Sequence, residues 1–96
     1  MFTVVRSEHF SKGLSGLKDR RAVARISTRI DRLVDGNLGD AKPVGDCVSE
    51  LRIDYGPGYR VYLVRRDGTV VVLLCGGTKK TQRRDIARAK KLALEP

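Results

Sequence analysis

The chain has few of the residues from which metal sites, disulfide frameworks and histidine-based active sites are built. Its 96 residues include one histidine and two cysteines. These are too few for a tetrahedral zinc site of the usual spacing, and one histidine cannot supply the acid–base pair of a two-histidine ribonuclease. We therefore expect no metal and no cofactor. Cys47 and Cys75 lie in different kinds of segment, which favours reduced thiols with Cys75 in the core.

Long hydrophobic runs are also missing. The longest, Val70 to Cys75, is far shorter than the roughly 20 residues that a membrane-spanning helix needs. The first residues, Met1 to Arg6, lack the charged region and long apolar stretch that are typical of a signal peptide. The sequence therefore predicts a soluble, cytoplasmic protein that does not contact a membrane.

Positive charge is what the chain has in excess. Lysine and arginine number 20 against 11 acidic residues, which gives a net charge of +9. Such an excess indicates a polyanionic partner: nucleic acid, an acidic protein, or each in turn. Apolar residues make up 41% and charged residues 32%, a balance typical of a folded chain. At this length we expect a single domain over residues 1–96.

The spacing of apolar residues predicts an α+β fold in the order β-α-α-β-β-β-α. A short strand is expected at 2–5, followed by a short helix that carries Phe10, Leu14 and Leu17 on one face. Asp19 is the expected N-cap of a second helix, which Gly36 ends. Two helices with so short a connection form an antiparallel hairpin. Residues 36–46 are interpreted as a loop.

The second half of the chain is rich in strand patterns. Strands are expected at 48–55, 59–64 and 70–75, joined as an antiparallel meander with a hairpin turn at Asp67-Gly68. A last helix, capped by Thr78 or Thr81, follows. We expect the helices to lie on one face of this small antiparallel sheet.

Alternation along the strands separates an apolar face from a polar one. Leu51, Ile53, Val61 and Leu63 are expected to face the helices. The opposite face would be open and would carry Glu50, Arg52, Asp54, Arg60 and Tyr62. Two interpretations remain. This face is either a solvated surface with cross-strand ion pairs or an anion-binding concavity, and the adjacent Lys79, Lys80, Arg83 and Arg84 add positive potential to it.

Several segments together resemble a known family. Residues 50–62 read ELRIDYGPGYRVY, residues 36–45 read GNLGDAKPVG, and residues 73–82 read LLCGGTKKTQ, with LKDRR at 17–21. In this order and spacing they resemble the RelE/ParE toxin superfamily, most closely the HigB-like branch of phage-derived addiction module killer proteins. One departure is Gly13, where the family often has tryptophan.

This resemblance implies the RelE-like fold and the toxin half of a type II toxin–antitoxin system. The implied partners are a cognate antitoxin, expected to be a helix-turn-helix protein, and the ribosome with its messenger RNA. RelE-like members are endoribonucleases that cut messenger RNA on the ribosome, whereas ParE-like members share the fold and poison DNA gyrase. We expect the first activity. A gyrase poison and a non-catalytic nucleic-acid-binding module remain as alternatives.

The resemblance also suggests a role for each polar residue. Arg60 would stabilise the transition state and Arg52 would hold a phosphate, while Lys79 or Lys80 would protonate the leaving oxygen. Glu50 is either a base or, more simply, the carboxylate that orients the arginines, and Tyr62 would stack on a base or reach the phosphate.

Further cations are candidates for RNA binding outside this centre. They are Arg83 and Arg84, in the last helix, and Arg25 and Arg29, in the second helix. The arginines of the second helix are otherwise a solvated face, or a docking surface for ribosomal RNA or an acidic antitoxin segment. Tyr55 and Tyr59 are expected in the core and His9 at the surface.

Overall fold

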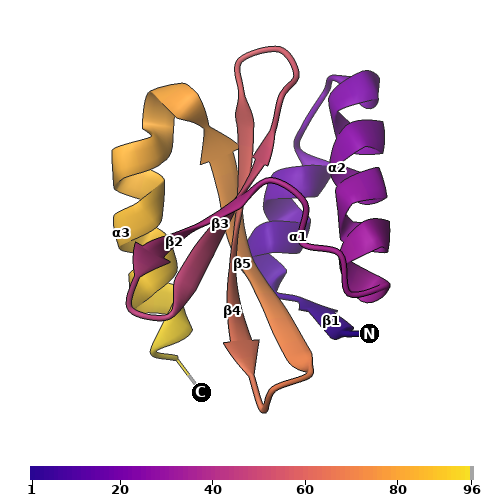
Figure 1. Cartoon of the computed structure of the whole chain (residues 1–96). Coiled ribbons are helices and arrows are strands. Elements are labelled where there is room, and N and C mark those ends of the chain that lie inside the picture. The colour runs from indigo at the N-terminus through magenta and orange to yellow at the C-terminus, as the bar shows by residue number, and fades with distance from the viewer. Residues whose placement is uncertain (96) are drawn as a thin grey trace.

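The computed structural model, which describes residues 1–95, contains one five-stranded mixed sheet (Figure 1). Its strand order is β1-β5-β4-β3-β2. The strands are β1 (Thr3–Arg6), β2 (Ala41–Gly45), β3 (Val48–Ile53), β4 (Tyr59–Arg66) and β5 (Val70–Thr78). The meander of β3, β4 and β5 is confirmed. The prediction of a purely antiparallel sheet is wrong for β1, which pairs with β5 in parallel. Two helices and three other strands separate β1 from β5 along the chain.

The three helices lie where the sequence indicated, except that the first ends at Ser15, so Leu17 lies beyond it and not on its apolar face. They are α1 (Glu8–Ser15), α2 (Arg20–Val34) and α3 (Gln82–Ala93), the last preceded by a single 3₁₀ turn, η1 (Lys79–Thr81). Asp19 Oδ1 accepts the backbone N–H groups of Arg21 and Ala22, which satisfies two donors that the first turn of α2 leaves free. Gly36, with a φ of 90°, follows the end of α2 as expected.

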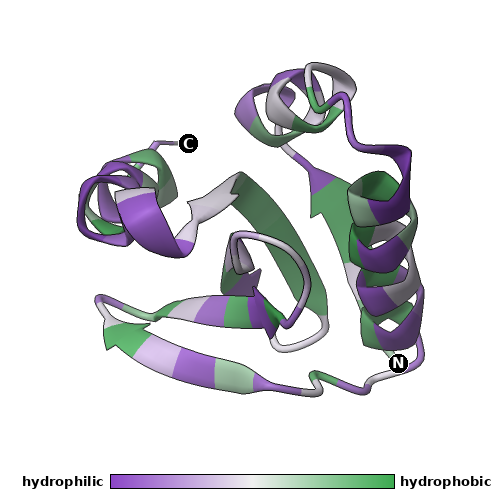
Figure 2. Ribbon diagram, turned by 90° about the horizontal axis from the view of Figure 1, so that it is seen from above, coloured by the Kyte–Doolittle hydropathy of each residue, from purple (hydrophilic) through white to green (hydrophobic). Residues whose placement is uncertain are grey.

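Helices cover both faces of the sheet, so the prediction that they share one face is wrong. Figure 2 shows α3 on one side of the sheet and α1 with α2 on the other. The core under α1 and α2 is formed by Phe10, Ile26, Ile30, Leu33, Leu51, Ile53, Val61, Leu63, Val71 and Leu73. The core under α3 is formed by Val48, Tyr62, Val64, Leu74, Cys75 and Ala89. Burial of Cys75 confirms its expected core position.

A β-bulge explains part of this second core. Tyr62 pairs with Cys75 while Leu63 pairs with Leu73, so Leu74 has no partner across the strands. The extra residue places Leu74 and Cys75 in succession against α3. Together with Val48 and Val64 they make part of the predicted polar face apolar, and α3 packs against that part.

The predicted loop at 36–46 contains the edge strand β2. Pro43 lies within β2, where an edge strand tolerates the missing N–H group. Asp46 and Cys47, both with positive φ, form the two-residue turn into β3, and Asp67-Gly68 forms the predicted hairpin turn between β4 and β5. Within residues 1–95, no helix combines the length and the apolar character needed to cross a membrane.

Candidate active site

A buried carboxylate lies at the centre of the polar part of the sheet. Glu50, in the middle of β3, has no exposed surface. Its Oε1 accepts the Nε–H of Arg52 at 3.1 Å, and its Oε2 accepts the hydroxyl of Tyr62 at 3.0 Å and the side-chain amide of Gln82 at 2.8 Å. The strand register aligns Glu50 with Tyr62 and Arg52 with Arg60, which brings Arg60 Nε within 3.7 Å of Oε1.

The carboxylate of Glu50 stays ionised in this environment. Burial raises the pKa of Glu50, but the hydrogen bonds from Gln82, Arg52 and Tyr62, with the nearby charge of Arg60, outweigh it and leave the pKa below its ordinary value. A carboxylate with a lowered pKa is a weak base and a strong hydrogen-bond acceptor. Of the two predicted roles, this arrangement suits the orientation of the arginines.

Tyr62 does not lie on an open face as predicted. Its side chain is fully buried in the core under α3 and donates its hydroxyl to Glu50. Burial, followed by the hydrogen bond to Glu50, raises the pKa of Tyr62 well above its ordinary value. A ring in this position is not available for stacking on a nucleotide base, because α3 covers it.

Arg52, Arg60 and Lys79 line one open cleft of about 430 Å³. It lies where β3 ends and β4 begins, and its other lining residues are Asp40, Ile53, Asp54, Gly56, Pro57 and Gly58. The side chain of Arg60 is only 11% exposed, so the predicted exposed position is wrong. Its buried Nε has no hydrogen-bond partner in residues 1–95. Because a buried guanidinium needs acceptors, an anion in the cleft would complete its coordination.

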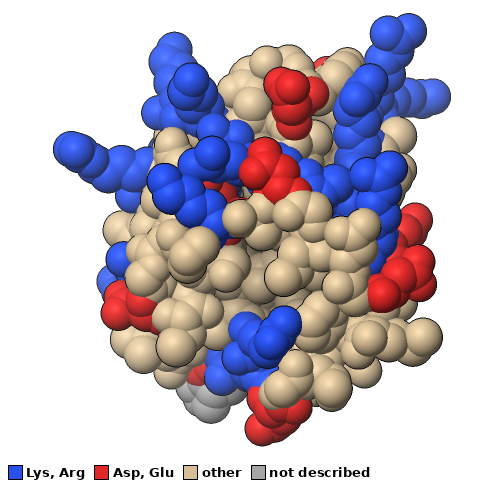
Figure 3. All heavy atoms as spheres, viewed as in Figure 1, with Lys and Arg blue, Asp and Glu red and all other residues tan. Residues whose placement is uncertain are grey.

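Lys79 is tied to the turn between β3 and β4. Its backbone N–H donates to the carbonyl of Gly58 at 2.8 Å. The other cations predicted at this end, Lys80, Arg83 and Arg84, are exposed and do not line the cleft. Arg84 Nε lies 3.5 Å from Asp85 Oδ1. Figure 3 shows basic side chains gathered over the start of α3 at the upper left and over α2 at the upper right.

Arg25 and Arg29, the candidates on α2, have different surroundings. The guanidinium of Arg25 is exposed and lies 4.8 Å from the ring centroid of Tyr55, a cation–π contact. Arg29 donates to the backbone carbonyls of Arg52, Leu38 and Asp40. Burial lowers the pKa of Arg29. Arg29 therefore holds the 38–40 segment against β3.

Two features of the site were missed by the sequence analysis. Gln82 reaches Glu50 from 32 positions away, and no local pattern indicates such a contact. Asp85 is buried, accepts the hydroxyl of Thr81, and lies so close to Gly77 that a Cβ there would overlap its carboxylate. Gly77, the second of two glycines that follow the apolar run of β5, was a signal for this close approach.

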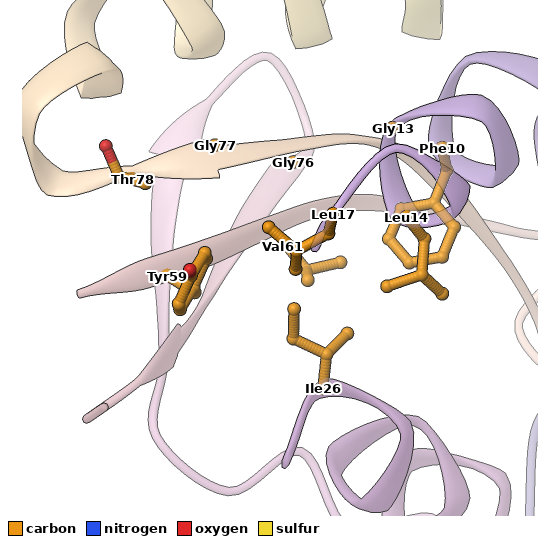
Figure 4. A pocket seen from close by; sticks show the side chains of 10 residues that line it. All are labelled: Phe10, Gly13, Leu14, Leu17, Ile26, Tyr59, Val61, Gly76, Gly77 and Thr78. Carbon is orange, nitrogen blue, oxygen red and sulfur yellow. The ribbon is translucent and has the colours of Figure 1, made fainter. Parts of the chain in front are cut away.

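An apolar pocket of about 160 Å³ lies on the opposite face of the sheet, between α1 and the strands (Figure 4). Side chains from α1, α2 and β4 point into it, among them Phe10, Leu14, Ile26, Tyr59 and Val61. Tyr55 and Tyr59 pack against the core under α1 and α2, as predicted. His9 is exposed, as expected, with Nδ1 3.3 Å from Arg88 Nη2. The cationic cleft is therefore the better candidate for chemistry.

Comparisons with known proteins agree with this picture. Residues 13–94 match the family described as "Phage derived protein Gp49-like (DUF891)". An uncharacterized protein of Haemophilus influenzae is 57% identical over 86 residues, which cover 90% of this chain and 87% of that protein.

Two solved toxin–antitoxin complexes contain a chain with a similar fold. For the intact RelBE complex of E. coli the TM-score is 0.67 at 15% identity, covering 81% of this chain and 96% of that one. For RelBE2 of Mycobacterium tuberculosis the TM-score is 0.63 at 23% identity, covering 81% and 98%. Both likenesses confirm the RelE-like α+β fold.

Proposed function

Because the chain belongs to the Gp49-like family of phage-derived proteins, we propose that it is the toxin of a type II toxin–antitoxin pair. The solved relatives with the same fold are described as parts of toxin–antitoxin complexes. The net charge of +9 suits neutralisation by an acidic segment of a cognate antitoxin, for which we expect a helix-turn-helix protein.

The proposed activity is ribosome-dependent cleavage of messenger RNA, which takes place in the cytoplasm. The 2′-oxygen of one nucleotide attacks the adjacent phosphorus and releases its proton to water. The bond from that phosphorus to the 5′-oxygen of the next nucleotide breaks, and the 5′-oxygen gains a proton. The products are a 2′,3′-cyclic phosphate and a 5′-hydroxyl. The protein has to align the attack and to neutralise the charge that grows on the phosphate oxygens.

Each cation of the cleft has a role in this reaction. Arg60 binds the oxygens of the phosphate that is cut, and Arg52 binds the same or a neighbouring phosphate. Lys79 protonates the leaving oxygen, with Lys80 beside it as the alternative donor. Glu50 keeps both arginines in place through the contacts to their Nε atoms.

The observation that carries the proposal is the buried Nε of Arg60, in a cleft shared with Arg52 and Lys79. Within residues 1–95 it forms no hydrogen bond and has a 3.7 Å ion-pair contact to Glu50. A structural ion-pair network would satisfy every buried donor, whereas a phosphate-binding site leaves donors for its ligand. The absence of a histidine pair from the sequence agrees with an enzyme that takes part of its alignment from the ribosome.

Single-turnover cleavage on programmed ribosomes tests this function. We expect Arg60→Ala to slow cleavage by about 100-fold or more, the usual effect of removing one transition-state donor. Lys79→Ala should lose less if Lys80 substitutes for it, and the double variant should lose more than either.

The control for these variants is Lys91→Ala, at an exposed position of α3 away from the cleft. Thermal melts and ribosome pelleting check that each variant is folded and bound. A folded Arg60→Ala protein that cleaves at the parental rate would refute the assignment of the cleft.

A further inference from the structure

A second basic hollow adjoins the cleft. It measures about 270 Å³ and lies between α2 and the end of β3. Its lining residues are Arg25, Thr28, Arg29, Arg32, Ile53 and Asp54. Ile53 and Asp54 also line the cleft that holds Arg60. The two hollows are therefore neighbours along one surface, joined at the end of β3.

Helical geometry places the cations of this second hollow in a row. Arg25, Arg29 and Arg32 are spaced four and three residues apart, so they share one face of α2. With a rise of 1.5 Å per residue, Arg25 and Arg32 are separated by roughly 10 Å along the helix axis. Both are exposed, and neither forms an ion pair with an acidic side chain within residues 1–95.

Arg29 forms the partition between the hollows. Its guanidinium binds the carbonyls of Arg52 and Asp40, two residues that line the cleft. The charge of Arg29 is therefore committed to holding the cleft wall. Arg25 and Arg32, on either side of it along α2, keep theirs available for a ligand.

We propose that the cleft and the α2 hollow form one continuous track for a single RNA strand. The cleft holds the phosphate that is cut, and Arg25 and Arg32 bind phosphates of nucleotides on one side of it. Asp54, at the shared rim, repels phosphate and so separates the two phosphate-binding positions. Figure 3 shows acidic side chains between two groups of basic ones at this end of the molecule.

The identity of the ligand as RNA rests on the proposed function, but the track is tested without ribosomes and without cleavage. The probes are fluorescent oligouridylates of about three and about nine nucleotides, lengths that occupy one hollow or both. Affinity is measured by anisotropy over a series of salt concentrations. The Arg25→Gln/Arg32→Gln double variant is compared with a charge-matched control, Arg65→Gln/Lys91→Gln, whose exposed positions line neither hollow.

Losing two phosphate contacts to a single strand should reduce the slope of log K against log salt by about 1.4, at about 0.7 for each contact. We expect this reduction for the longer RNA only, and only in the Arg25/Arg32 variant. Equal effects of both variants, or an equal effect on both RNA lengths, would overturn the track. So would a variant that loses affinity for oligoglutamate while its affinity for RNA stays parental.

These outcomes are separable from failure of the proposed function. If the longer RNA shows the expected slope change while Arg60→Ala leaves ribosomal cleavage unchanged, the track exists and the catalytic assignment is wrong. If Arg60→Ala abolishes cleavage while the slope stays parental, the cleft acts alone.

Discussion

Glu50 combines full burial with negative charge, and its neighbours determine how it behaves. Buried carboxylates persist only where several donors replace the lost water. Here Arg52, Tyr62 and Gln82 donate to it, and Arg60 lies at 3.7 Å. The same carboxylate thus fixes two arginines at the cleft wall and one helix, α3, on the sheet.

Replacing Glu50 by glutamine should change how stability depends on pH. The pKa of Glu50 is lower in the folded than in the unfolded chain, so its contribution is present above about pH 4.3, the unfolded value, and is lost as pH falls through the folded pKa. We expect Glu50→Gln to unfold more easily at neutral pH, by about 3 kcal/mol, the cost of breaking a buried charge pair. Below pH 4 its stability should fall less steeply than the parental stability.

Urea unfolding at neutral and acidic pH measures both effects. Glu8→Gln is the control, because Glu8 is exposed and its ion pair with Lys12 lies at the surface. A Glu50→Gln protein whose stability declines with acid as steeply as that of the parent would show that Glu50 does not carry the dependence.

Tyr62→Phe separates a structural hydroxyl from a catalytic one. It removes the 3.0 Å hydrogen bond to Glu50 and leaves the buried ring in place. Since hydrogen bonds to charged groups contribute about 1.5–3 kcal/mol, we expect unfolding free energy to fall by about 2 kcal/mol. Cleavage should stay within a few-fold of the parental rate, because α3 shields the hydroxyl from RNA.

Denaturant melts and ribosomal cleavage, each repeated on Tyr55→Phe, provide the measurement and its control. Tyr55 is half-buried against the other core, and its variant should match the parent in stability. Parental stability together with a 100-fold slower reaction would instead place the Tyr62 hydroxyl at the reacting atoms.

At this scale the sequence predicted which cations meet but not how they are held. Alternation along β3 and β4, with the family resemblance, was enough to place Arg52, Arg60 and Lys79 together. The contact from Gln82 to Glu50 joins a helix to a strand, and no periodicity specifies which long-range pair forms. Exposure of Tyr62 was mispredicted because it depends on where α3 packs, and the burial of Arg60 follows from no local pattern in the sequence.

The helix α3 shows the same limit at the scale of whole elements. Its existence and its start near Thr81 were predicted from a polar residue and an apolar repeat, although the Thr81 side chain forms no hydrogen bond that caps the helix. Its side of the sheet depends on Val48, Val64 and the bulge at Leu74, which together create a second apolar surface. A bulge shifts the register by one residue, and strict alternation cannot reveal it. The edge strand β2 was missed because it contains Pro43 and Gly45, and both residue types are uncommon in strands.

Two glycines with equal free space should respond in opposite ways to alanine. A Cβ at Gly13, inside α1, or at Gly68, in the β4–β5 turn, would meet no atom within 4 Å. Gly68 has a φ of 71°, whereas Gly13 has no positive φ. We expect Gly13→Ala to raise unfolding free energy by about 1 kcal/mol through helix propensity. Gly68→Ala should lower it by about 1–2 kcal/mol, because left-handed backbone disfavours a side chain.

Thermal and urea melts of both variants measure the difference. Each variant is the control for the other, because both add one methyl group where there is room for it. Gly13 also borders the apolar pocket beside α1 (Figure 4). Two variants that shift stability in the same direction would mean that packing at these sites, rather than backbone conformation, determines the response.

At the scale of the whole molecule, charge determines what the protein associates with. The net charge of +9 is spread over helices on both faces, and much of it lies at the end where the cleft opens (Figure 3). Such a surface is attracted to any polyanion at a distance, which favours fast encounter with ribosomal RNA, messenger RNA or an acidic partner alike. Under the proposed function, target choice comes from the cleft, whose fixed cations would distinguish the reacting phosphate from neighbouring ones.

Expression of the chain without the proposed antitoxin should therefore stop translation before DNA synthesis falls. The fold alone is compatible with gyrase poisoning, but a gyrase binder needs no cluster of Arg52, Arg60 and Lys79 in a cleft. Pulse-labelling with an amino acid and with thymidine after induction measures the order of arrest, and Arg60→Ala provides the matched control. We expect amino-acid incorporation to fall first in the parent and neither label to fall in the variant. DNA synthesis that fails first, with induction of the DNA-damage response, would identify gyrase as the target instead.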